Sequence, residues 1–194
     1  MQLRATTIRS LSHMMLACLA IGAFTLLDRS KIQIREIERI QHARMWQGFA
    51  TFRQGILDRE KGRALPDSHF ERKHLFHGTD EDTVPKILMG GFKRDYAGKN
   101  AVMYGRGVYF ARDAKYSSAR LYSKPNANGV QHIFMVRVVV GEFCKGNDGQ
   151  PRPNVRQGAL LYDSTVDDVS NPSIFVAADD AQYYPEYLVK FTQS

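Results

Sequence analysis

The chain of 194 residues is 43% hydrophobic and 24% charged, proportions typical of one soluble globular domain with room for a short appendage. This composition excludes a disordered protein, and nothing in the sequence repeats at a fixed period. The net charge of +7 comes almost entirely from residues 1–75, which hold 13 basic and 7 acidic residues, whereas residues 76–194 hold 14 and 13.

The basic residues of the N-terminal part do not form the clustered stripe that is typical of nucleic-acid binding. Between residues 35 and 63 six arginines are interspersed with acidic residues, as on the solvated face of a helix. Nucleic-acid binding is therefore not expected, and an RNA-associated role of this part is kept only as an alternative.

The cysteines and histidines do not predict a metal site. Cys18 and Cys144 form no CxxC or Cys/His pattern, which argues against structural zinc and against a disulfide scaffold. His74 and His77 would point to opposite faces of a strand. The triplet at 171–173 is blocked as a glycosylation site by its proline, so it and the cysteines favour a reducing compartment, cytoplasmic or nuclear.

Residues 1–27 are apolar toward their end and contain no acidic residue. Arg4 and Arg9 followed by the apolar run at 14–27 fit a signal peptide or membrane anchor, although the run is short for a membrane span. The alternative, which the cysteines and the blocked triplet favour, is a helix that packs on the domain or a partly non-native start. Residues 1–30 are therefore treated as an uncertain hydrophobic segment and residues 31–194 as the domain.

Residues 31–41 carry apolar side chains whose spacing changes from two to three, which leaves strand and helix both open. Residues 43–61 are predicted to form an amphipathic helix, because their apolar side chains recur at three and four positions. Residues 62–68, with Pro66, are expected to form the loop that ends this helix.

A short strand is predicted over residues 74–77. A helix over about 81–89 should follow, capped by Asp80 and closed by Gly90-Gly91. Residues 92–107 read as a polar loop of about 16 residues, and loops of that length inside compact domains are usually functional.

The second half of the chain is rich in strand patterns, and few helices without regular βαβ alternation indicate an α+β fold. Residues 108–111 are predicted as a strand, after which Asp113 is expected to cap a helix that runs through Tyr122. Further strands are predicted over residues 131–143, 173–178 and 187–191.

His77-Gly78-Thr79 leaves a strand with an imidazole, an uncovered backbone and a hydroxyl in succession. Glycine lets a flat polar group approach the main chain, and the histidine can hydrogen-bond a ribose hydroxyl. Taken singly, a histidine at a strand end is more often a structural residue.

The segment from Tyr104 to Ala111 contains a G-x-G, but it lacks the third glycine and the following helix of a dinucleotide fingerprint. Its glycines allow a tight turn directly before the predicted strand that carries Tyr109. Ser117 and Tyr122 follow, a hydroxyl and an aromatic ring suited to binding an amide and stacking on its heteroaromatic plane. Each of these features alone is compatible with a core or surface role.

Together these segments resemble, in order and spacing, the catalytic domain of the poly(ADP-ribose) polymerase-like ADP-ribosyltransferases. The resemblance runs from about residue 34 to residue 191 and is strongest to the mono-ADP-ribosylating, macrodomain-containing members. It implies an α+β fold of split, mostly antiparallel sheets flanked by short helices. The matching blocks are Ile37-Glu38-Arg39-Ile40-Gln41, Leu75-Phe76-His77-Gly78-Thr79, Tyr96-Ala97-Gly98-Lys99-Asn100-Ala101, Tyr109-Phe110-Ala111, Gly141-Glu142-Phe143, Leu161-Tyr162-Asp163-Ser164, Asn171-Pro172-Ser173 and Tyr184-Pro185-Glu186-Tyr187.

The resemblance also implies that the chain binds NAD⁺ as a co-substrate. His77 would hold the adenosine-side ribose with Thr79 nearby, and the backbone of Gly78, helped by the Ser117 hydroxyl, would bind the nicotinamide carboxamide. The nicotinamide ring and the dinucleotide would be enclosed by three tyrosines: Tyr109 and Tyr122 flanking the ring, and Tyr96 in the covering loop at 92–104.

Polymerising members of this family place a glutamate where this chain has Ile174. A carboxylate there stabilises the oxocarbenium-like transition state and orients a sugar hydroxyl for chain growth. Isoleucine can do neither, so transfer is expected to stop after one unit, with a Glu or Asp of the acceptor supplying the charge. Glu186 is a weak substitute, because the family pattern places it before the last strand, away from the ribose.

The expected partners are acceptor proteins, the chain itself included. Little room precedes His77 for the helical autoinhibitory region of the polymerising branch, so DNA-break activation is not expected. Two alternatives stay open: a catalytically inactive module that binds NAD⁺ or ADP-ribose, and a secreted or membrane-anchored form of the same enzyme.

Overall fold

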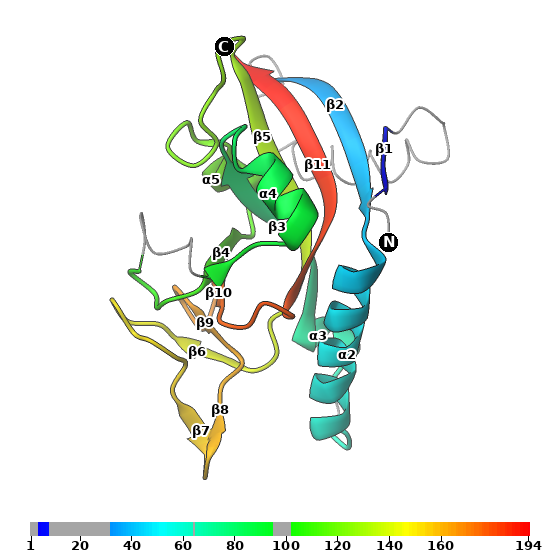
Figure 1. Ribbon diagram of the computed structural model, residues 1–194. Coiled ribbons are helices and arrows are strands. Elements are labelled where there is room, and N and C mark those ends of the chain that lie inside the picture. Colours follow the sequence, from blue (N-terminus) through cyan, green and yellow to red (C-terminus); the bar gives the residue numbers. More distant parts are fainter. Residues whose placement is uncertain (1–3, 8–31, 64, 95–101) are drawn as a thin grey trace.

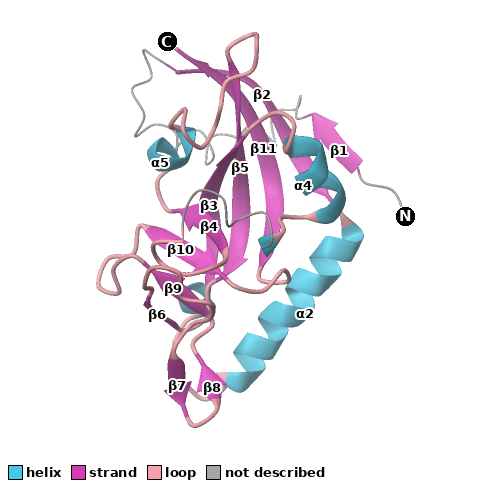
Figure 2. Ribbon diagram, turned by 60° about the vertical axis from the view of Figure 1, so that its left-hand side comes forward, coloured by secondary structure: helices cyan, strands magenta, loops and turns pink. Residues whose placement is uncertain are grey.

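The computed structural model describes residues 4–7, 32–63, 65–94 and 102–194 (Figures 1 and 2). The predicted α+β class is confirmed, because strands dominate and α2 is the one long helix of the described part. The helices are α2 (Ala43–Arg59), α3 (Asp67–Phe70), α4 (Val84–Gly90) and α5 (Ala114–Ser118). The strands are β1 (Arg4–Thr7), β2 (Ile32–Gln41), β3 (Glu71–Thr79), β4 (Val108–Ala111), β5 (Val130–Val139), β6 (Phe143–Lys145), β7 (Val155–Gln157), β8 (Leu160–Leu161), β9 (Ser164–Val166), β10 (Ile174–Ala177) and β11 (Tyr183–Gln193).

Nine of the described strands form one sheet in the order β1-β2-β11-β5-β3-β4-β10-β9-β6, and β7 pairs separately with β8. All neighbours in the large sheet are antiparallel except β6 and β9, which are parallel. α2 continues from β2, and the β7–β8 pair projects at the same end of the molecule (Figure 1).

Residues 31–41, for which periodicity left strand and helix open, contain the strand β2. It pairs with β11 on one side and with β1 on the other. β1 is a strand that the sequence did not predict, inside the segment 1–30 that was left uncertain. The apolar run at 14–27 lies outside the described residues, and no described helix is long and apolar enough to cross a bilayer.

The predicted helix at 43–61 is confirmed as α2. His42 caps it, because its Nδ1 accepts the Met45 N–H at 3.2 Å. Phe49 and Ile56 are buried at 1% and 5% exposure in a cluster that includes Tyr184 of β11. This burial anchors the helix to the end of the sheet. The predicted loop at 62–68 was partly wrong, since the short helix α3 begins at Asp67.

Two helices are shorter than predicted. α4 begins at Val84 and not at Glu81. The residues before it form a turn in which the Asp80 side chain accepts the Thr83 N–H at 2.8 Å. α5 ends at Ser118 instead of continuing to Tyr122, since its C-cap residue is extended. The predicted Asp113 cap makes no side-chain hydrogen bond to α5.

The strand predicted at 131–143 ends earlier than predicted, because β5 stops at Val139 and Phe143 already begins the next strand, β6. Gly141, with a φ of +56°, turns the chain between them. A Cβ there would lie 2.3 Å from Oδ2 of Asp163, so only glycine fits this corner. The turn sends the chain away from the central strands into the short strands β6 to β9, of which only β6 overlaps a predicted strand, at Phe143.

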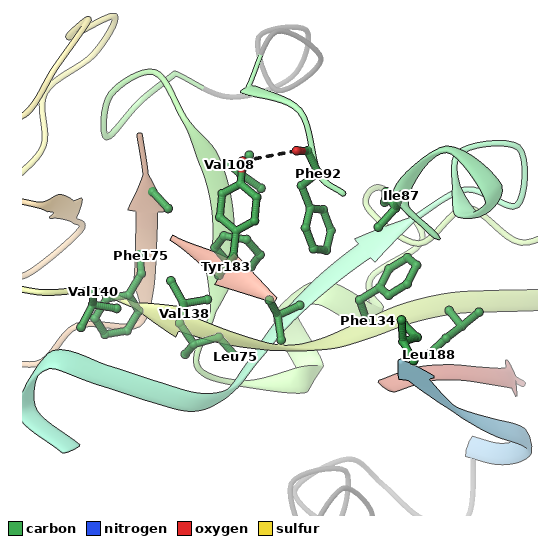
Figure 3. Close-up of a cluster of buried hydrophobic side chains, with 14 of the residues drawn as sticks. Leu75, Ile87, Phe92, Val108, Phe134, Val138, Val140, Phe175, Tyr183 and Leu188 are labelled. Atoms are coloured by element: carbon green, nitrogen blue, oxygen red, sulfur yellow. Dashed lines mark hydrogen bonds between the residues drawn. The ribbon is translucent and has the colours of Figure 1, made fainter. Parts of the chain in front are cut away.

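The main core lies on one face of the sheet, where α4 and the segment after it cover the central strands (Figure 3). Phe134, Val136 and Val138 alternate along β5 toward this face and are fully buried. Phe92, the first residue after α4 and its glycines, is 3% exposed, and its carbonyl accepts a hydrogen bond from the Tyr183 hydroxyl at 3.4 Å. The start of the long loop at 92–107 is thereby fixed to the core.

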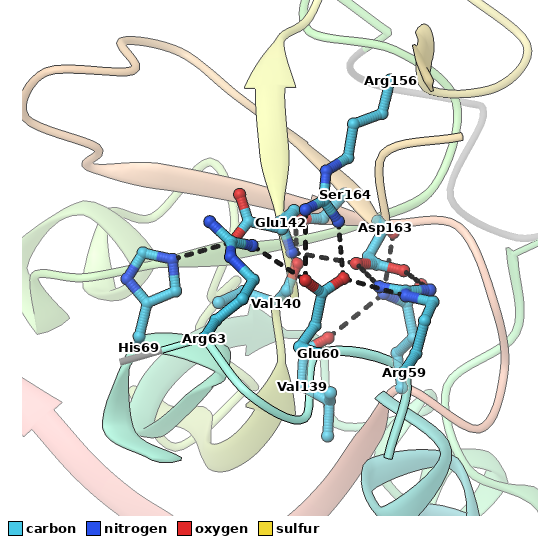
Figure 4. A network of polar contacts seen from close by, with 11 residues as sticks. Arg59, Glu60, Arg63, His69, Val139, Val140, Glu142, Arg156, Asp163 and Ser164 are labelled. Atoms are coloured by element: carbon cyan, nitrogen blue, oxygen red, sulfur yellow. Dashed lines mark hydrogen bonds and ion pairs between the residues drawn. The ribbon is translucent and has the colours of Figure 1, made fainter. Parts of the chain in front are cut away.

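A network of arginines and acids joins the end of α2 to the segment that carries β6 to β9 (Figure 4). Its centre is Glu60, which is 6% exposed. Arg156 Nη1 lies 2.5 Å from one carboxylate oxygen of Glu60, and Arg63 Nη1 lies 2.8 Å from the other. Arg59 bridges Glu60 at 3.0 Å and Asp163 at 2.6 Å. Hydrogen bonding from Arg156, followed by that from Arg63 and Arg59, overcomes the effect of burial and holds the pKa of Glu60 far below its usual value of 4.5.

Replacing Glu60 by glutamine is expected to lower the free energy of unfolding at pH 7 by about 2 kcal/mol, because three partly exposed arginines lose their common anion. Because the pKa of Glu60 is lowered on folding, its ionised side chain stabilises the fold fully above the usual value of 4.5, and this contribution is lost progressively as the pH falls from there toward the folded-state pKa. The difference between wild type and Glu60→Gln should therefore shrink in urea titrations below pH 4.5. Asp58→Asn is the control, since this exposed carboxylate accepts only from Gln54 among the hydrogen bonds described. An equal loss in both variants would contradict the assignment.

Candidate active site

The candidate site lies where β3 and β4 separate. The two strands pair only at Phe76 and Ala111, after which β3 continues with β5 as its strand partner and β4 with β10. Over residues 77–79 one edge of β3 therefore has no strand partner among the described residues. Such an edge presents backbone donors and acceptors that a planar polar ligand can use.

His77 bridges this split. Its Nδ1 lies 2.9 Å from the backbone oxygen of Tyr109. A carbonyl only accepts hydrogen bonds, so Nδ1 carries the hydrogen and a neutral ring keeps Nε2 as an acceptor. Burial lowers the pKa of His77, against the opposing effect of the Tyr109 carbonyl. The ring is therefore neutral at pH 7, and its Nε2 can accept a hydroxyl hydrogen. The edge of this ring packs against Phe92 at a centroid distance of 4.8 Å.

Gly78 is required because α5 and the chain that follows it pack directly on it. A Cβ at this position would lie 2.1 Å from the backbone oxygen of Ser117 and 3.2 Å from the backbone nitrogen of Ser123. The Ser117 hydroxyl is buried and donates its hydrogen to the Phe76 carbonyl at 3.0 Å, which leaves its two lone pairs as acceptors. The expected proximity of Gly78 and Ser117 is present. The glycine itself is explained by protein packing, which the sequence did not indicate.

The hydroxyl of Tyr109 is engaged within the chain. It donates to the Gly105 carbonyl at 2.7 Å and accepts the Tyr104 N–H at 3.0 Å. Burial raises the pKa of this hydroxyl. A hydroxyl with both partners in place and a raised pKa is a poor acid–base group, so its ring is the part available to a ligand.

Ile174 lies on the same face of the sheet as Tyr109. It pairs with Ala111 across β10 and β4 and packs in a small cluster that contains Tyr109. Its side chain is 4% exposed, whereas the next residue, Phe175, points into the main core. Ile174 therefore lies next to Tyr109 at the candidate site, and its side chain is uncharged.

The carboxylate of Asp167 is close in the chain to Ile174 but is already engaged. It accepts the backbone N–H groups of Ser173 and Ile174 at 2.9 and 3.0 Å and also the Ser173 hydroxyl. Burial tends to raise the pKa of Asp167, but these hydrogen bonds outweigh it and lower that pKa. Glu186 is further away: it lies on β11, four strands from β10, or about 19 Å at the usual strand spacing. Neither residue replaces a carboxylate at position 174.

Three predicted site residues remain to be placed: Thr79, Tyr122 and Tyr96. Thr79 is buried and pairs with His132 on β5, on the face that carries His77. Tyr122 stacks on Tyr116 at a centroid distance of 4.8 Å, with an interplanar angle of 24°. Tyr96 lies outside the described residues.

The sequence prediction did not include Phe92 or Tyr116. Phe92 could have been found as the aromatic residue directly after the Gly90-Gly91 helix end, and Tyr116 as the ring next to Ser117. Among the described residues no group of three or more His, Cys, Asp or Glu side chains is placed to hold a metal ion.

Comparison with known proteins gives a consistent result. A sequence model described as "Poly(ADP-ribose) polymerase catalytic domain" matches residues 25–193. Human "Protein mono-ADP-ribosyltransferase PARP14" is 43% identical over 165 residues, human PARP12 is 37% identical over 163, and mouse PARP10 is 35% identical over 161. These alignments cover 84%, 83% and 82% of this chain but 9%, 22% and 16% of the relatives. The chain thus spans less than a quarter of the length of each.

Proposed function

The chain belongs to the poly(ADP-ribose) polymerase catalytic-domain family, and on this premise we propose that it is a protein mono-ADP-ribosyltransferase. It transfers one ADP-ribose unit from NAD⁺ to a side chain of an acceptor protein, which can be the chain itself, and it releases nicotinamide. The observation that carries this proposal is the apolar Ile174 beside Tyr109, where polymerising members have a glutamate.

In this proposal the split between β3 and β4 receives the dinucleotide. Nε2 of His77 accepts a hydroxyl hydrogen of the adenosine-side ribose, with Thr79 nearby. The backbone of Gly78 binds the carboxamide of nicotinamide, helped by the Ser117 hydroxyl. Three tyrosines complete the site in this proposal: Tyr109 and Tyr122 flank the ring, and Tyr96 belongs to the loop over the dinucleotide.

The reaction breaks the bond between C1′ of the ribose and the ring nitrogen of nicotinamide. The electron pair stays with nicotinamide, which leaves as a neutral molecule, so no metal is proposed to assist its departure. A carboxylate of the acceptor stabilises the cationic ribose and then forms the new C1′–O bond. Because Ile174 cannot activate a sugar hydroxyl, the attached unit is not extended.

Incubation of the full chain with labelled NAD⁺ is expected to add single ADP-ribose units to one or more side chains. Intact-protein and peptide mass spectrometry would resolve these additions, and hydroxylamine should release them because acyl esters are cleaved by this nucleophile. Polymers on one site would contradict the role of Ile174. NAD⁺ binding without any transfer would instead favour a module that binds but does not turn over.

The compartment proposed for this reaction is the cytoplasm or nucleus. Cys144 is a buried free thiol, which fits a reducing environment.

A further inference from the structure

The turn between β9 and β10 folds back on its own first residue, Asp167. One carboxylate oxygen of Asp167, Oδ1, accepts the backbone N–H groups of Ser173 and Ile174 at 2.9 and 3.0 Å, and the other accepts the Ser173 hydroxyl. The backbone N–H of Asp167 in turn donates to the Ile174 carbonyl at 3.3 Å. Asp167 therefore engages both backbone polar groups of Ile174, the first residue of β10.

The same turn is also attached to the end of β4. Arg112, the residue after β4, donates from its backbone N–H to the Ser173 carbonyl at 2.8 Å and from its guanidinium Nη1 to Asn171 Oδ1 at 2.7 Å. β10 pairs with β4 from its first residue onward, which brings Ile174 into one cluster with Tyr109. The place of Ile174 beside Tyr109 thus depends on how the turn before it is held.

Under the proposed function, on which this inference rests, the cationic ribose forms beside Ile174. The Ile174 side chain is apolar and 4% exposed, so it shields that side of the ribose from water as long as the start of β10 stays in place. We propose that Asp167 is a positioning residue for the transfer step, which keeps Ile174 against the ribose and thereby favours attack by the acceptor carboxylate over attack by water. Asp167 acts through Ile174, because its own carboxylate is engaged by the three donors of the turn.

The reaction that competes with transfer is hydrolysis of NAD⁺. A water oxygen forms the new bond to C1′, the bond from C1′ to nicotinamide breaks with its electron pair leaving on nicotinamide, and the water loses a proton to the solvent. Hydrolysis gives free ADP-ribose, whereas transfer gives ADP-ribose attached to protein. The ratio of free to attached ADP-ribose therefore measures how well the site excludes water.

The hydrogen bonds of Asp167 explain why its loss would admit water. Without the carboxylate, the N–H of Ile174 has no acceptor at a buried position, and an unpaired buried N–H is costly. Residues 173 and 174 then shift until water satisfies this group. Asparagine avoids the shift, because its Oδ1 can accept both N–H groups and its amide can donate to the Ser173 hydroxyl, which is also an acceptor.

The test is to incubate the full chain with labelled NAD⁺ and to quantify nicotinamide, free ADP-ribose and attached ADP-ribose. For Asp167→Ala the ratio of free to attached ADP-ribose should rise about tenfold, which corresponds to the loss of one or two hydrogen bonds of ordinary strength. Asp167→Asn should keep the wild-type ratio. Asp168→Ala is the matched control, because Asp168 is an exposed carboxylate of the same turn that accepts the N–H and the hydroxyl of Ser170. Its ratio should equal that of wild type.

A wild-type ratio in Asp167→Ala would overturn the inference, and so would a raised ratio in Asp167→Asn or in Asp168→Ala. If Asp167→Ala fails to fold, as judged by circular dichroism, Ser173→Ala decides in its place. This variant loses only the hydroxyl bond to Asp167, so its ratio should rise about threefold, and an unchanged ratio would overturn the inference. Absence of attached ADP-ribose in wild type would instead overturn the proposed function, so the two failures are distinguishable.

Discussion

Replacing His77 by alanine is expected to reduce ADP-ribose transfer by about 100-fold or more while the chain stays folded. The variant loses the Nε2 acceptor proposed for the ribose, and it loses the Nδ1–H bond to the Tyr109 carbonyl that bridges the split between β3 and β4. Without the bond from the His77 Nδ1–H, the Tyr109 backbone is no longer held beside the position proposed for nicotinamide. Because both losses affect contacts proposed for bound NAD⁺, His77→Ala should lower the affinity for NAD⁺ as well as the rate of transfer.

The measurement is incorporation of labelled ADP-ribose, together with the rise in melting temperature that NAD⁺ produces. His74→Ala is a matched control, because His74 lies on the same strand with an exposed side chain. Since burial lowers the pKa of His77 below its usual 6.5, wild-type activity should not fall between pH 8 and about 6.5 from protonation of this ring. Wild-type transfer by His77→Ala would refute the role given to this residue.

Replacing Gly78 by alanine is expected to lower the free energy of unfolding by about 2 kcal/mol and to abolish transfer. The new methyl group would lie 2.1 Å from the Ser117 backbone oxygen. Backbone atoms on both sides would have to move, since Ser123 N is 3.2 Å away. The φ of Gly78 is not in the left-handed region, so the cost comes from this close approach and not from backbone strain. Movement of Ser117 would also disturb its hydrogen bond to the Phe76 carbonyl.

Urea unfolding and the transfer assay measure the two effects of Gly78→Ala. Gly55→Ala is the control for a glycine-to-alanine change, because a Cβ at Gly55 in α2 meets nothing within 4 Å. That variant should be stabilised by roughly 0.5–1 kcal/mol, the ordinary gain of alanine in a helix interior. A Gly78→Ala chain as stable and active as wild type would show that the Ser117 segment can shift at little cost.

Local patterns in the sequence predicted the elements whose side chains repeat regularly. α2 follows its apolar spacing, and β4 has the predicted bounds of 108–111. The helix ends were less predictable, because the start of α4 depends on a single hydrogen bond from Thr83 to Asp80. β7 to β9 are only two or three residues long, too short for any periodicity to appear.

The sequence predicted the residues of the candidate site but not the contacts between them. The motifs around His77 and Tyr109 named the two residues, yet their contact runs from an imidazole to a backbone carbonyl, which no side-chain pattern encodes. The packing of Ser117 on Gly78 and the stack of Tyr116 on Tyr122 depend equally on where α5 ends. Such contacts arise from chain geometry, so only the folded structure gives them.

The position of β11 inside the sheet has a consequence for how the chain folds. β11 lies between β2 and β5, so Glu36 pairs with Lys190 across most of the sequence. Contacts of such high sequence separation slow folding, because a long loop must close before they form. During synthesis the edges of β2 and β5 that pair with β11 stay unpaired until residues 183–193 have emerged from the ribosome. Until then these edges present unpaired backbone N–H and C=O groups, which favour non-native strand pairing between chains.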